Sequence, residues 1–244
     1  MKNDKKKYDV SIIIPCHNEE ENIENCIKRI PNLNLKTEIV VVDDGSKDNT
    51  AEVVRKLQKR YKNLKLISYN TNKGKGPAVN TGMTKAMGEI LIILDADMAV
   101  RPEDIPKFIN PLLTNKNIFV NGTRFQRKME KGAMKKFNLI GNKLMGYMFS
   151  KAISQKITDS LCGTKALYKN DFNKMGGISK DDPWSDFSLI FGAARLNLRI
   201  IEIPISYRKR IAGKSKMKLL KHSFQLFRVW FKQYSIFRSA SATC

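Results

Sequence analysis

Short apolar runs alternate with helix-compatible segments through the first hundred residues, and this alternation constrains the fold more than any other feature of the sequence. The runs are rich in Val, Ile and Leu and have the length of strands: residues 10–15, 38–44, 64–70 and 89–97. The segments between them have the length of helices: residues 19–30, residues 48–61 with Asp48 as the expected N-cap, and a Gly-rich turn with a helix to about Met87. Apolar strands separated by helices predict an α/β fold whose mostly parallel central sheet is flanked by helices on both faces.

The second half of the chain is less regular. Residues 118–125 and 199–207 have the composition of strands, and residues 184–196 predict a helix. Residues 130–157 carry apolar side chains at helical spacing among lysines: Met134, Phe137, Ile140, Leu144, Met148 and Ala152. From Ile203 onward no residue is acidic, and basic residues alternate with Phe, Leu and Trp. We therefore predict one domain over residues 8–212 and a basic amphipathic C-terminal extension over residues 213–244.

The net charge of +22 on 244 residues implies an anionic partner. Nucleic acid, a phosphorylated substrate and an anionic membrane surface all fit that charge. Nucleic acid is not expected, because the sequence has no helix-turn-helix, RRM, KH or zinc pattern and its strand ends carry acids that would repel phosphates. The four cysteines are scattered, which predicts reduced thiols in the cytoplasm. No apolar run approaches the length of a spanning helix, so we expect any membrane association to be peripheral.

Each of the first four predicted strands leads into polar residues. The four groups are Pro15-Cys16-His17-Asn18-Glu19, Asp43-Asp44-Gly45-Ser46, Lys73-Gly74-Lys75-Gly76 and Asp95-Ala96-Asp97. Because ligands of open α/β sheets bind beyond the carboxyl ends of the strands, we expect the four groups to line one crevice. Their convergence indicates a binding site more strongly than any single group does.

Asp95 and Asp97 form a D-x-D pair at a strand end, where two carboxylates one residue apart can point the same way. Carboxylate oxygens suit Mg²⁺ or Mn²⁺, and such an ion would bridge a diphosphate and neutralise the charge that develops as it leaves. A bare D-x-D is more often a solvated loop, but this pair follows an apolar strand in an alternating pattern. Asp43 and Asp44 fit either a turn or the recognition of nucleoside hydroxyls and base N–H groups. The Gly-rich turn at residues 73–76 would let backbone N–H groups and a lysine approach phosphate, although it lacks Walker A spacing.

Several segments, in this order and spacing, resemble the family 2 glycosyltransferases, which have the GT-A fold. They are SIIIPCHNEEENI, VVDDGSKDNT, NKGKGPAVNTG and LDADM. Three later segments are similar to the subgroup of dolichyl- or polyprenyl-phosphate mannosyl- and glucosyltransferases: TDSLCGTKALYKNDF, DPWSDFSLIFGAA and IEIPISYRKRIAGKSK. The resemblance spans about residues 9–220. CGTK at 162–165 departs from the more usual SGFR or CGFK, so the resemblance does not identify the sugar.

The resemblance implies an inverting, metal-dependent transfer of a hexose from a UDP- or GDP-sugar, and it assigns roles to matching residues. The nucleoside contacts would be Pro15, Asn18, Glu19, Asp43 and Asp44, with Lys75 nearby. Asp95 would face the ribose and the metal, and Asp97 would ligate the Mg²⁺ or Mn²⁺. Arg124 matches an arginine for the acceptor phosphate. Arg210 and Lys216 match a basic pair that clamps the donor diphosphate.

The acceptor remains open between two chemistries. A membrane lipid such as polyprenyl or dolichyl phosphate is already an anion and needs positioning, whereas a hydroxyl of a diacylglycerol or surface polysaccharide needs a general base. Asp186 and Asp159 are the candidate bases; we favour Asp186, although it also fits an acid at a helix N-terminus. Asp97, Asp186 and Arg124 are therefore the predicted catalytic residues. A catalytically silent sugar-nucleotide-binding relative is a further alternative.

The two basic amphipathic segments, residues 130–157 and 213–238, predict contact with an anionic membrane surface at its cytoplasmic face. The alternative is that their apolar residues pack on the sheet or on a second subunit. The sequence does not indicate an oligomeric state.

Overall fold

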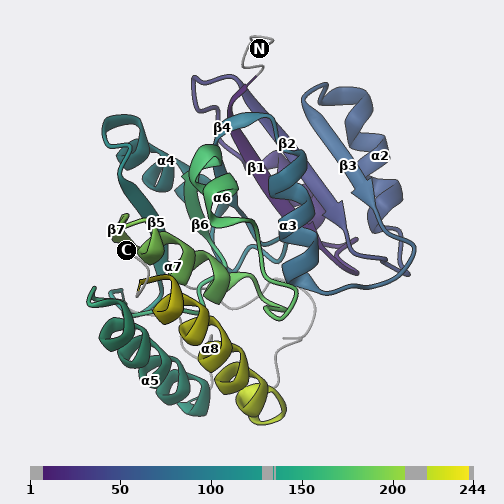
Figure 1. Cartoon of the computed structure of the whole chain (residues 1–244). Coiled ribbons are helices and arrows are strands. Elements are labelled where there is room, and N and C mark those ends of the chain that lie inside the picture. Colours follow the sequence, from purple (N-terminus) through teal and green to yellow (C-terminus); the bar gives the residue numbers. More distant parts are fainter. Residues whose placement is uncertain (1–7, 128–133, 135, 207–218, 242–244) are drawn as a thin grey trace.

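The computed structural model describes residues 8–127, 134, 136–206 and 219–241 (Figure 1). In this part of the chain, one seven-stranded sheet has the order β3-β2-β1-β4-β6-β5-β7. The strands are β1 (Tyr8–Cys16), β2 (Thr37–Asp43), β3 (Leu64–Ser68), β4 (Gly88–Ile93), β5 (Ile118–Thr123), β6 (Lys165–Tyr168) and β7 (Arg199–Pro204). Only β6 pairs antiparallel, with β4 and β5, while the other neighbours pair parallel. The predicted mostly parallel sheet is confirmed.

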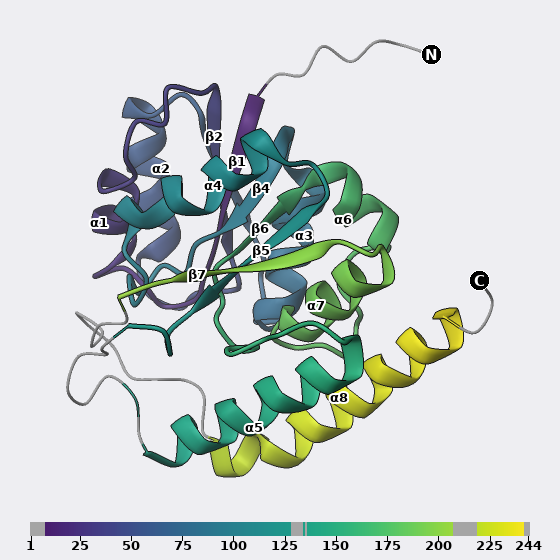
Figure 2. The same ribbon diagram turned by 90° about the vertical axis from the view of Figure 1, so that its left-hand side faces the viewer.

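Helices cover both faces of the sheet (Figure 2). The described helices are α1 (Ile23–Lys28), α2 (Thr50–Arg60), α3 (Lys75–Lys85), α4 (Ile105–Thr114) after a 3₁₀ turn (Pro102–Asp104), α5 (Lys136–Ile153), α6 (Lys169–Met175), α7 (Asp186–Arg195) and α8 (Leu219–Ser241). In β1, Ile12 and Ile14 pack in the core under α1, α2 and α4, while Ile13 packs in the core with α3 and α7. A strand buried on both faces reads as a continuous apolar run, and that is why the sequence pattern was clear.

Three elements were not predicted, and several element boundaries differ by a few residues. The unpredicted elements are α4, β6 and α6. Strand β6 is too short for a clear pattern, because it has four residues and begins with a lysine. Helix α1 has six residues rather than the twelve expected, since the chain turns where Asn22 and Ile23 donate their N–H groups to the Glu19 carbonyl. The N-cap position of α2 is Asn49, although Asp48 still accepts the N–H of Thr50 at 3.0 Å.

The long amphipathic segments form α5 and α8, which lie side by side below the sheet in Figure 1. Helix α8 packs on α7 through buried Leu226, Val229 and Trp230. An aromatic cluster joins the three helices: the ring centroids of Phe149 and Phe191 are 4.8 Å apart, and those of Phe191 and Trp230 are 6.0 Å apart. One face of α8 is therefore part of the folded core, and the domain boundary at residue 213 stays a prediction.

The neighbouring residues Trp230 and Phe231 test this packing. Trp230 is 6% exposed and Phe231 is 59% exposed. We expect Trp230→Ala to lower the free energy of unfolding by about 3–5 kcal/mol, because it leaves a cavity among the aromatic rings. Phe231→Ala is the matched control and should change it by less than about 0.5 kcal/mol. Urea unfolding followed by circular dichroism measures both; equal effects of the two substitutions would contradict the packing of α8.

Candidate active site

The candidate site lies where the sheet order reverses between β1 and β4. The chain proceeds from β1 to β2 and β3 on one side, while β4 pairs with the other side of β1. In open α/β sheets, ligands bind at such a switch point beyond the carboxyl ends of the strands. Pro15 and Cys16 are the last residues of β1 there, Asp43 ends β2, and Asp95 follows β4. Because β6 runs the other way, its first residue, Lys165, also lies at this edge.

A carboxylate–lysine cluster, made of Lys75, Asp95, Asp97, Lys165 and Asp186, forms the centre of the site. Lys75 is the first residue of α3, and its Nζ lies 2.6 Å from Oδ1 of Asp95. Burial alone would lower the pKa of Lys75, but the carboxylates of Asp95, Asp186 and Asp97 outweigh it and raise that pKa. Lys75 is therefore a charged ammonium surrounded by acids from two different elements.

Asp186 and Lys165 form the buried side of this cluster. Asp186 begins α7, and its Oδ1 lies 2.6 Å from Nζ of Lys165, which is fully buried and also donates to the Cys162 carbonyl. Burial raises the pKa of Asp186, and the ammonium groups of Lys165 and Lys75 oppose that rise without cancelling it. A buried ion pair is strongly destabilised when one partner is removed, so Asp186 and Lys165 depend on each other.

Two glycines bring the backbone close to the cluster. A Cβ on Gly163 would collide with Oδ2 of Asp95 and Nζ of Lys75, so the turn before β6 lies directly against that ion pair. A Cβ on Gly76 would collide with the carbonyl oxygen of Asp182, and the Gly76 N–H donates to the Pro183 carbonyl at 2.8 Å. The loop before α7 therefore rests on the first turn of α3.

Three residues with left-handed backbone lie beside the predicted site residues. Asn18 (φ 51°) follows β1, Met98 (φ 54°) follows Asp97, and Ser185 (φ 74°) precedes Asp186. Non-glycine residues adopt this conformation at an energetic cost, and such residues gather at ligand sites where the surrounding structure holds them. At Asn18 and Met98 the strain lies at or next to strand ends that the sequence singled out, and at Ser185 it lies at the start of α7.

The predicted nucleoside contacts lie at the ends of β1 and β2 and hold the loops there together. Asn18 Oδ1 accepts the N–H of Lys47 at 2.8 Å, and Glu19 Oε2 accepts from Asn22 at 2.8 Å. The Asp43 carboxylate accepts the N–H and hydroxyl of Ser46, both through Oδ1. Asp44 accepts the N–H groups of Lys73 and Gly74 at 2.7 and 2.8 Å, so it fixes the Gly-rich turn. These hydrogen bonds are compatible with both interpretations of Asp43 and Asp44, as turn residues and as nucleoside contacts.

Arg124 follows β5 and is held by a bidentate ion pair. Its Nε lies 2.6 Å from Oδ2 of Asp159, and its Nη2 lies 2.7 Å from Oδ1. Both side chains are buried. The predicted acceptor arginine and the second candidate base are thus partners of each other. Arg210 and Lys216, the predicted diphosphate clamp, lie outside the described residues.

The structure thus brings Lys75, Asp95, Asp97 and Asp186 together, with Asp43 and Asp44 at a neighbouring strand end. Sequence reasoning assigned no role to Lys165 or Gly163. For Lys165 a signal was present in the sequence: a lysine that opens an otherwise apolar strand has to find a buried acidic partner.

The carboxylates of Asp95 and Asp97 fit a hard divalent cation. Mg²⁺ typically binds one or two protein carboxylates and completes its shell with water and substrate phosphate oxygens. The described residues contain no group of three or more His, Cys, Asp or Glu side chains that could hold a metal ion. A cation at Asp95 and Asp97 would therefore need further oxygens from a bound diphosphate. In the structure, Asp95 is paired with Lys75.

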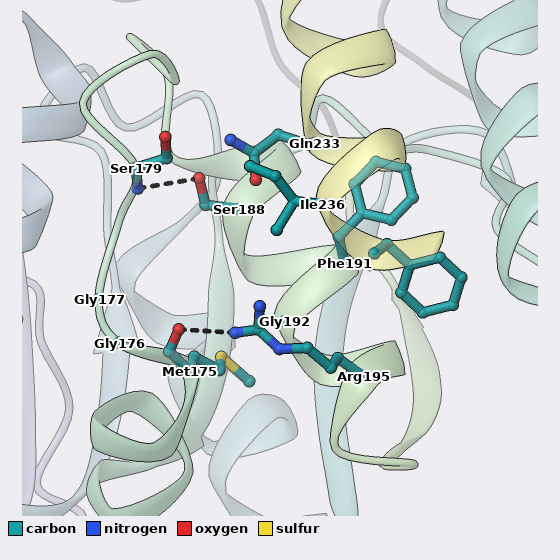
Figure 3. Close-up of a pocket in the computed structure, with 11 residues that line it drawn as sticks. Met175, Gly176, Gly177, Ser179, Ser188, Phe191, Gly192, Arg195, Gln233 and Ile236 are labelled. Carbon is teal, nitrogen blue, oxygen red and sulfur yellow. Dashed lines mark hydrogen bonds between the residues drawn. The ribbon is translucent and has the colours of Figure 1, made fainter. Parts of the chain in front are cut away.

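A cavity of about 160 Å³ lies elsewhere, between the loop before α7, α7 itself and α8 (Figure 3). Ser188, in the first turn of α7, lines the cavity and accepts the N–H of Ser179 at 3.2 Å, and Gln233 of α8 points toward it. Arg195 at its lower end in the view donates to the Met175 carbonyl at 2.7 Å. The cavity is therefore separate from the carboxylate–lysine cluster, and we assign it no part in the chemistry.

Asp182, in the loop that rests on α3, gives the site a measurable pH dependence. Burial, with Asp186 nearby, raises the pKa of Asp182 to about 6. Its pKa in the unfolded chain is about 3.9, so the folded protein binds an extra proton between about pH 4 and pH 6. The free energy of unfolding should therefore fall as the pH rises through this window, by at most about 3 kcal/mol.

Urea unfolding at several pH values tests this with Asp182→Asn, which cannot titrate. We expect the substitution to remove that downward trend, whatever its effect on stability at a single pH. If the free energy of unfolding changed with pH in the same way for both proteins across this window, the raised pKa of Asp182 would be refuted.

Comparison with known proteins shows the family of this chain. The family model described as "Glycosyl transferase family 2" matches residues 11–176. A dolichyl-phosphate beta-glucosyltransferase of Trichomonas vaginalis is 32% identical over 227 residues, which is 86% of this chain and 68% of that protein. A UDP-N-acetylglucosamine–dolichyl-phosphate N-acetylglucosaminyltransferase of Methanococcus voltae is 31% identical over 212 residues, 80% of this chain and 84% of that protein.

Solved structures show the same fold. A mannosyltransferase from Pyrobaculum calidifontis, solved with GDP-Man and Mn²⁺, superposes with a TM-score of 0.62 at 23% identity, over 91% of this chain and 61% of that one. The predicted GT-A fold and the resemblance to dolichyl-phosphate sugar transferases are confirmed. With the family model covering most of the sheet and the carboxylates after β4, the chain belongs to glycosyltransferase family 2.

Proposed function

We propose that this glycosyltransferase moves a hexose from a UDP- or GDP-sugar to a membrane lipid phosphate, a polyprenyl or dolichyl phosphate. The observation that carries the proposal is the carboxylate–lysine cluster at the switch point of the sheet. The two relatives described above are named for transfer to dolichyl phosphate, which supports the acceptor class.

Asp95 and Asp97 would hold the divalent cation, Mg²⁺ or Mn²⁺, that the family resemblance implies. When bound, it would supply positive charge to the diphosphate that leaves the sugar. Lys75 lies beside the same carboxylates and keeps Asp95 in place by its ion pair. Asp43, whose hydrogen bonds with Ser46 use Oδ1 alone, keeps Oδ2 for a nucleoside hydroxyl or base N–H. Inversion by direct displacement then requires only that the acceptor oxygen approach from the opposite side of the sugar.

The two candidate bases favour a phosphate acceptor. Asp159 is held by Arg124, and Asp186 is held by Lys165, so each carboxylate already has a buried cationic partner. A phosphate oxyanion needs orientation and no deprotonation, so this arrangement is sufficient for it. Arg124 would then orient the acceptor while Asp159 fixes its guanidinium plane.

The second candidate function is transfer to a hydroxyl of a diacylglycerol or surface polysaccharide with Asp186 as general base. One observation favours it: burial raises the pKa of Asp186, and a raised pKa improves a carboxylate as a base near neutral pH.

The proposed acceptor lies in a membrane, so we further propose that the protein works as a peripheral protein at the cytoplasmic face. Among the described residues, no helix combines the length and apolar character that crossing a bilayer requires.

The first prediction concerns Asp97, which is buried and accepts the N–H of Ala99 at 3.0 Å. Asp97→Asn keeps an oxygen for that bond but loses the charge for the cation. We expect turnover of the donor to fall at least about 100-fold and its dependence on added Mn²⁺ to weaken. Glu52→Gln, an exposed carboxylate on α2, is the control with the same charge change.

The assay uses a panel of UDP- and GDP-sugars with Mg²⁺ or Mn²⁺, with and without a short polyprenyl phosphate. Transfer to the lipid phosphate supports the proposal. Unchanged turnover and metal dependence in Asp97→Asn would refute the assigned role of the carboxylates.

The second prediction separates the two acceptor classes through Asp186. Asp186→Asn should lower transfer to a hydroxyl acceptor at least about 100-fold, since the base is lost, but should lower transfer to a lipid phosphate less than about tenfold. Because the substitution leaves Lys165 buried without its partner, the double variant Asp186→Asn with Lys165→Met serves as the charge-balanced comparison. Equal losses with both acceptors in the double variant would contradict a role limited to proton removal.

A further inference from the structure

Exposed apolar side chains gather on two helices. Among the described residues, nine large hydrophobic side chains are exposed, and seven of them lie on α5 or α8. Six of these form two stripes that we call the α5–α8 face: Ile140, Leu144 and Tyr147 on α5, and Phe224, Phe227 and Phe231 on α8. Phe224 is 80% exposed and Ile140 is 65% exposed. A patch of this kind marks an interaction site more often than chance exposure.

Helical spacing shows that each stripe points away from the body of the protein. On α5 the stripe repeats at i, i+4 and i+7, and the fully packed residues, Met145 and Phe149, fall on the opposite side of the helix. On α8 the stripe repeats at i, i+3 and i+7, opposite buried Leu226 and Val229. Because α5 and α8 lie side by side in both views, the stripes form one outer surface (Figures 1 and 2).

The charged side chains of the two helices are all basic, and one of them, Lys232, is paired with Asp181 of the loop before α7 at 2.7 Å. Neither α5 nor α8 contains an Asp or Glu. Lys151 lies one turn after Tyr147, with its Nζ 5.7 Å from the ring centroid, and Arg228 lies one turn after Phe224. Aromatic and aliphatic side chains flanked by basic ones are the composition of helices that lie in the interface of an anionic bilayer.

The same charge argues against a second copy of this chain as the occupant. A two-fold interface would place this patch against itself, so basic residues would meet basic residues with no acid on either helix to pair with them. A bilayer with anionic headgroups has no such conflict.

The position of the face fits the proposed acceptor. Helices α5 and α8 lie beyond the carboxyl ends of the parallel strands, on the side of the sheet opposite to the start of β1 (Figure 1). On its packed side, α5 touches the segment that holds the acceptor arginine: a Cβ on Gly146 would lie 2.9 Å from the carbonyl oxygens of Ile157 and Thr158, next to Asp159. Asp159 in turn binds Arg124. The segment of residues 157–159 therefore contacts α5 and, through Asp159, Arg124, so it links the helix that carries the outer surface to the predicted acceptor site.

We propose that the α5–α8 face docks the protein on an anionic bilayer surface. The six apolar side chains enter the headgroup region, and the neighbouring lysines and arginines contact anionic lipids. In the docked orientation, the Arg124 end of the site faces the lipid phosphate. This orienting role rests on the proposed function, whereas the docking itself does not.

Vesicle co-sedimentation of the full chain tests the docking. We expect binding to phosphatidylcholine vesicles with about 30 mol% phosphatidylglycerol to exceed binding to pure phosphatidylcholine at least about tenfold and to weaken with salt. Phe224→Ser with Phe231→Ser should lower binding to the anionic vesicles at least about tenfold. Met87→Ser with Leu113→Ser is the matched control, because these two exposed residues lie away from the face; it should leave binding unchanged.

Thermal melting confirms that both double variants fold. No binding of the wild type to anionic vesicles, or equal losses in the two variants, would overturn the proposal. The proposal would also be overturned if the wild type bound no vesicles and formed a dimer, while the double variant Phe224→Ser with Phe231→Ser, called the Phe variant below, was a monomer.

Activity separates docking from function. The Phe variant should lose transfer to a lipid phosphate embedded in vesicles but keep transfer to a short, water-soluble polyprenyl phosphate. Binding without any transfer would sustain the docking and refute the proposed function. Transfer to the embedded acceptor that is equal in wild type and Phe variant would refute the docking.

Discussion

The ion pair between Lys75 and Asp95 joins segments that the chain keeps far apart. Lys75 starts the helix after an edge strand, Asp95 follows a central strand, and the backbone of Gly163 lies against both side chains. Acids from β4 and α7 surround the ammonium group, which keeps three negative charges close to one another. Without it these carboxylates would repel one another, so the geometry of the site depends on the charge of Lys75.

The single antiparallel strand explains how the second half of the chain completes a site begun by the first. A parallel β6 would place Lys165 at the far edge of the sheet, whereas the reversed strand starts at the carboxyl end of β4. Lys165 can then hold Asp186 at the start of α7, and the preceding segment supplies Asp159 to hold Arg124. The two candidate site residues described after β4, Arg124 and Asp186, are thus each fixed by a buried opposite charge, as precise positioning of reacting groups requires.

The sequence was informative where periodicity is strong. The apolar runs at 10–15, 38–44 and 89–97 predicted strands because they are buried on both faces, and the polar residues after them marked the correct edge. It did not predict β6, whose four residues are too few for a pattern, or the ion pair of Lys165, whose partner Asp186 lies 21 residues away in the sequence. On α5 it identified the helix, yet Ile140 and Leu144 of the predicted apolar stripe are exposed, since spacing fixes which residues share a side and not which side meets the core.

The aromatic cluster of Phe149, Phe187, Phe191 and Trp230 has a consequence for any attempt to make a smaller catalyst from this chain. Phe187 is the immediate neighbour of Asp186, and its ring centroid lies 5.0 Å from that of Phe149, so the outermost helices pack against the residue next to the candidate base. Trimming the chain back to residue 218 would strip Trp230 from Phe191 and let water reach the second turn of α7. The packed core beside Asp186 therefore includes a helix, α8, that lies beyond residues 11–176, which the family model matches.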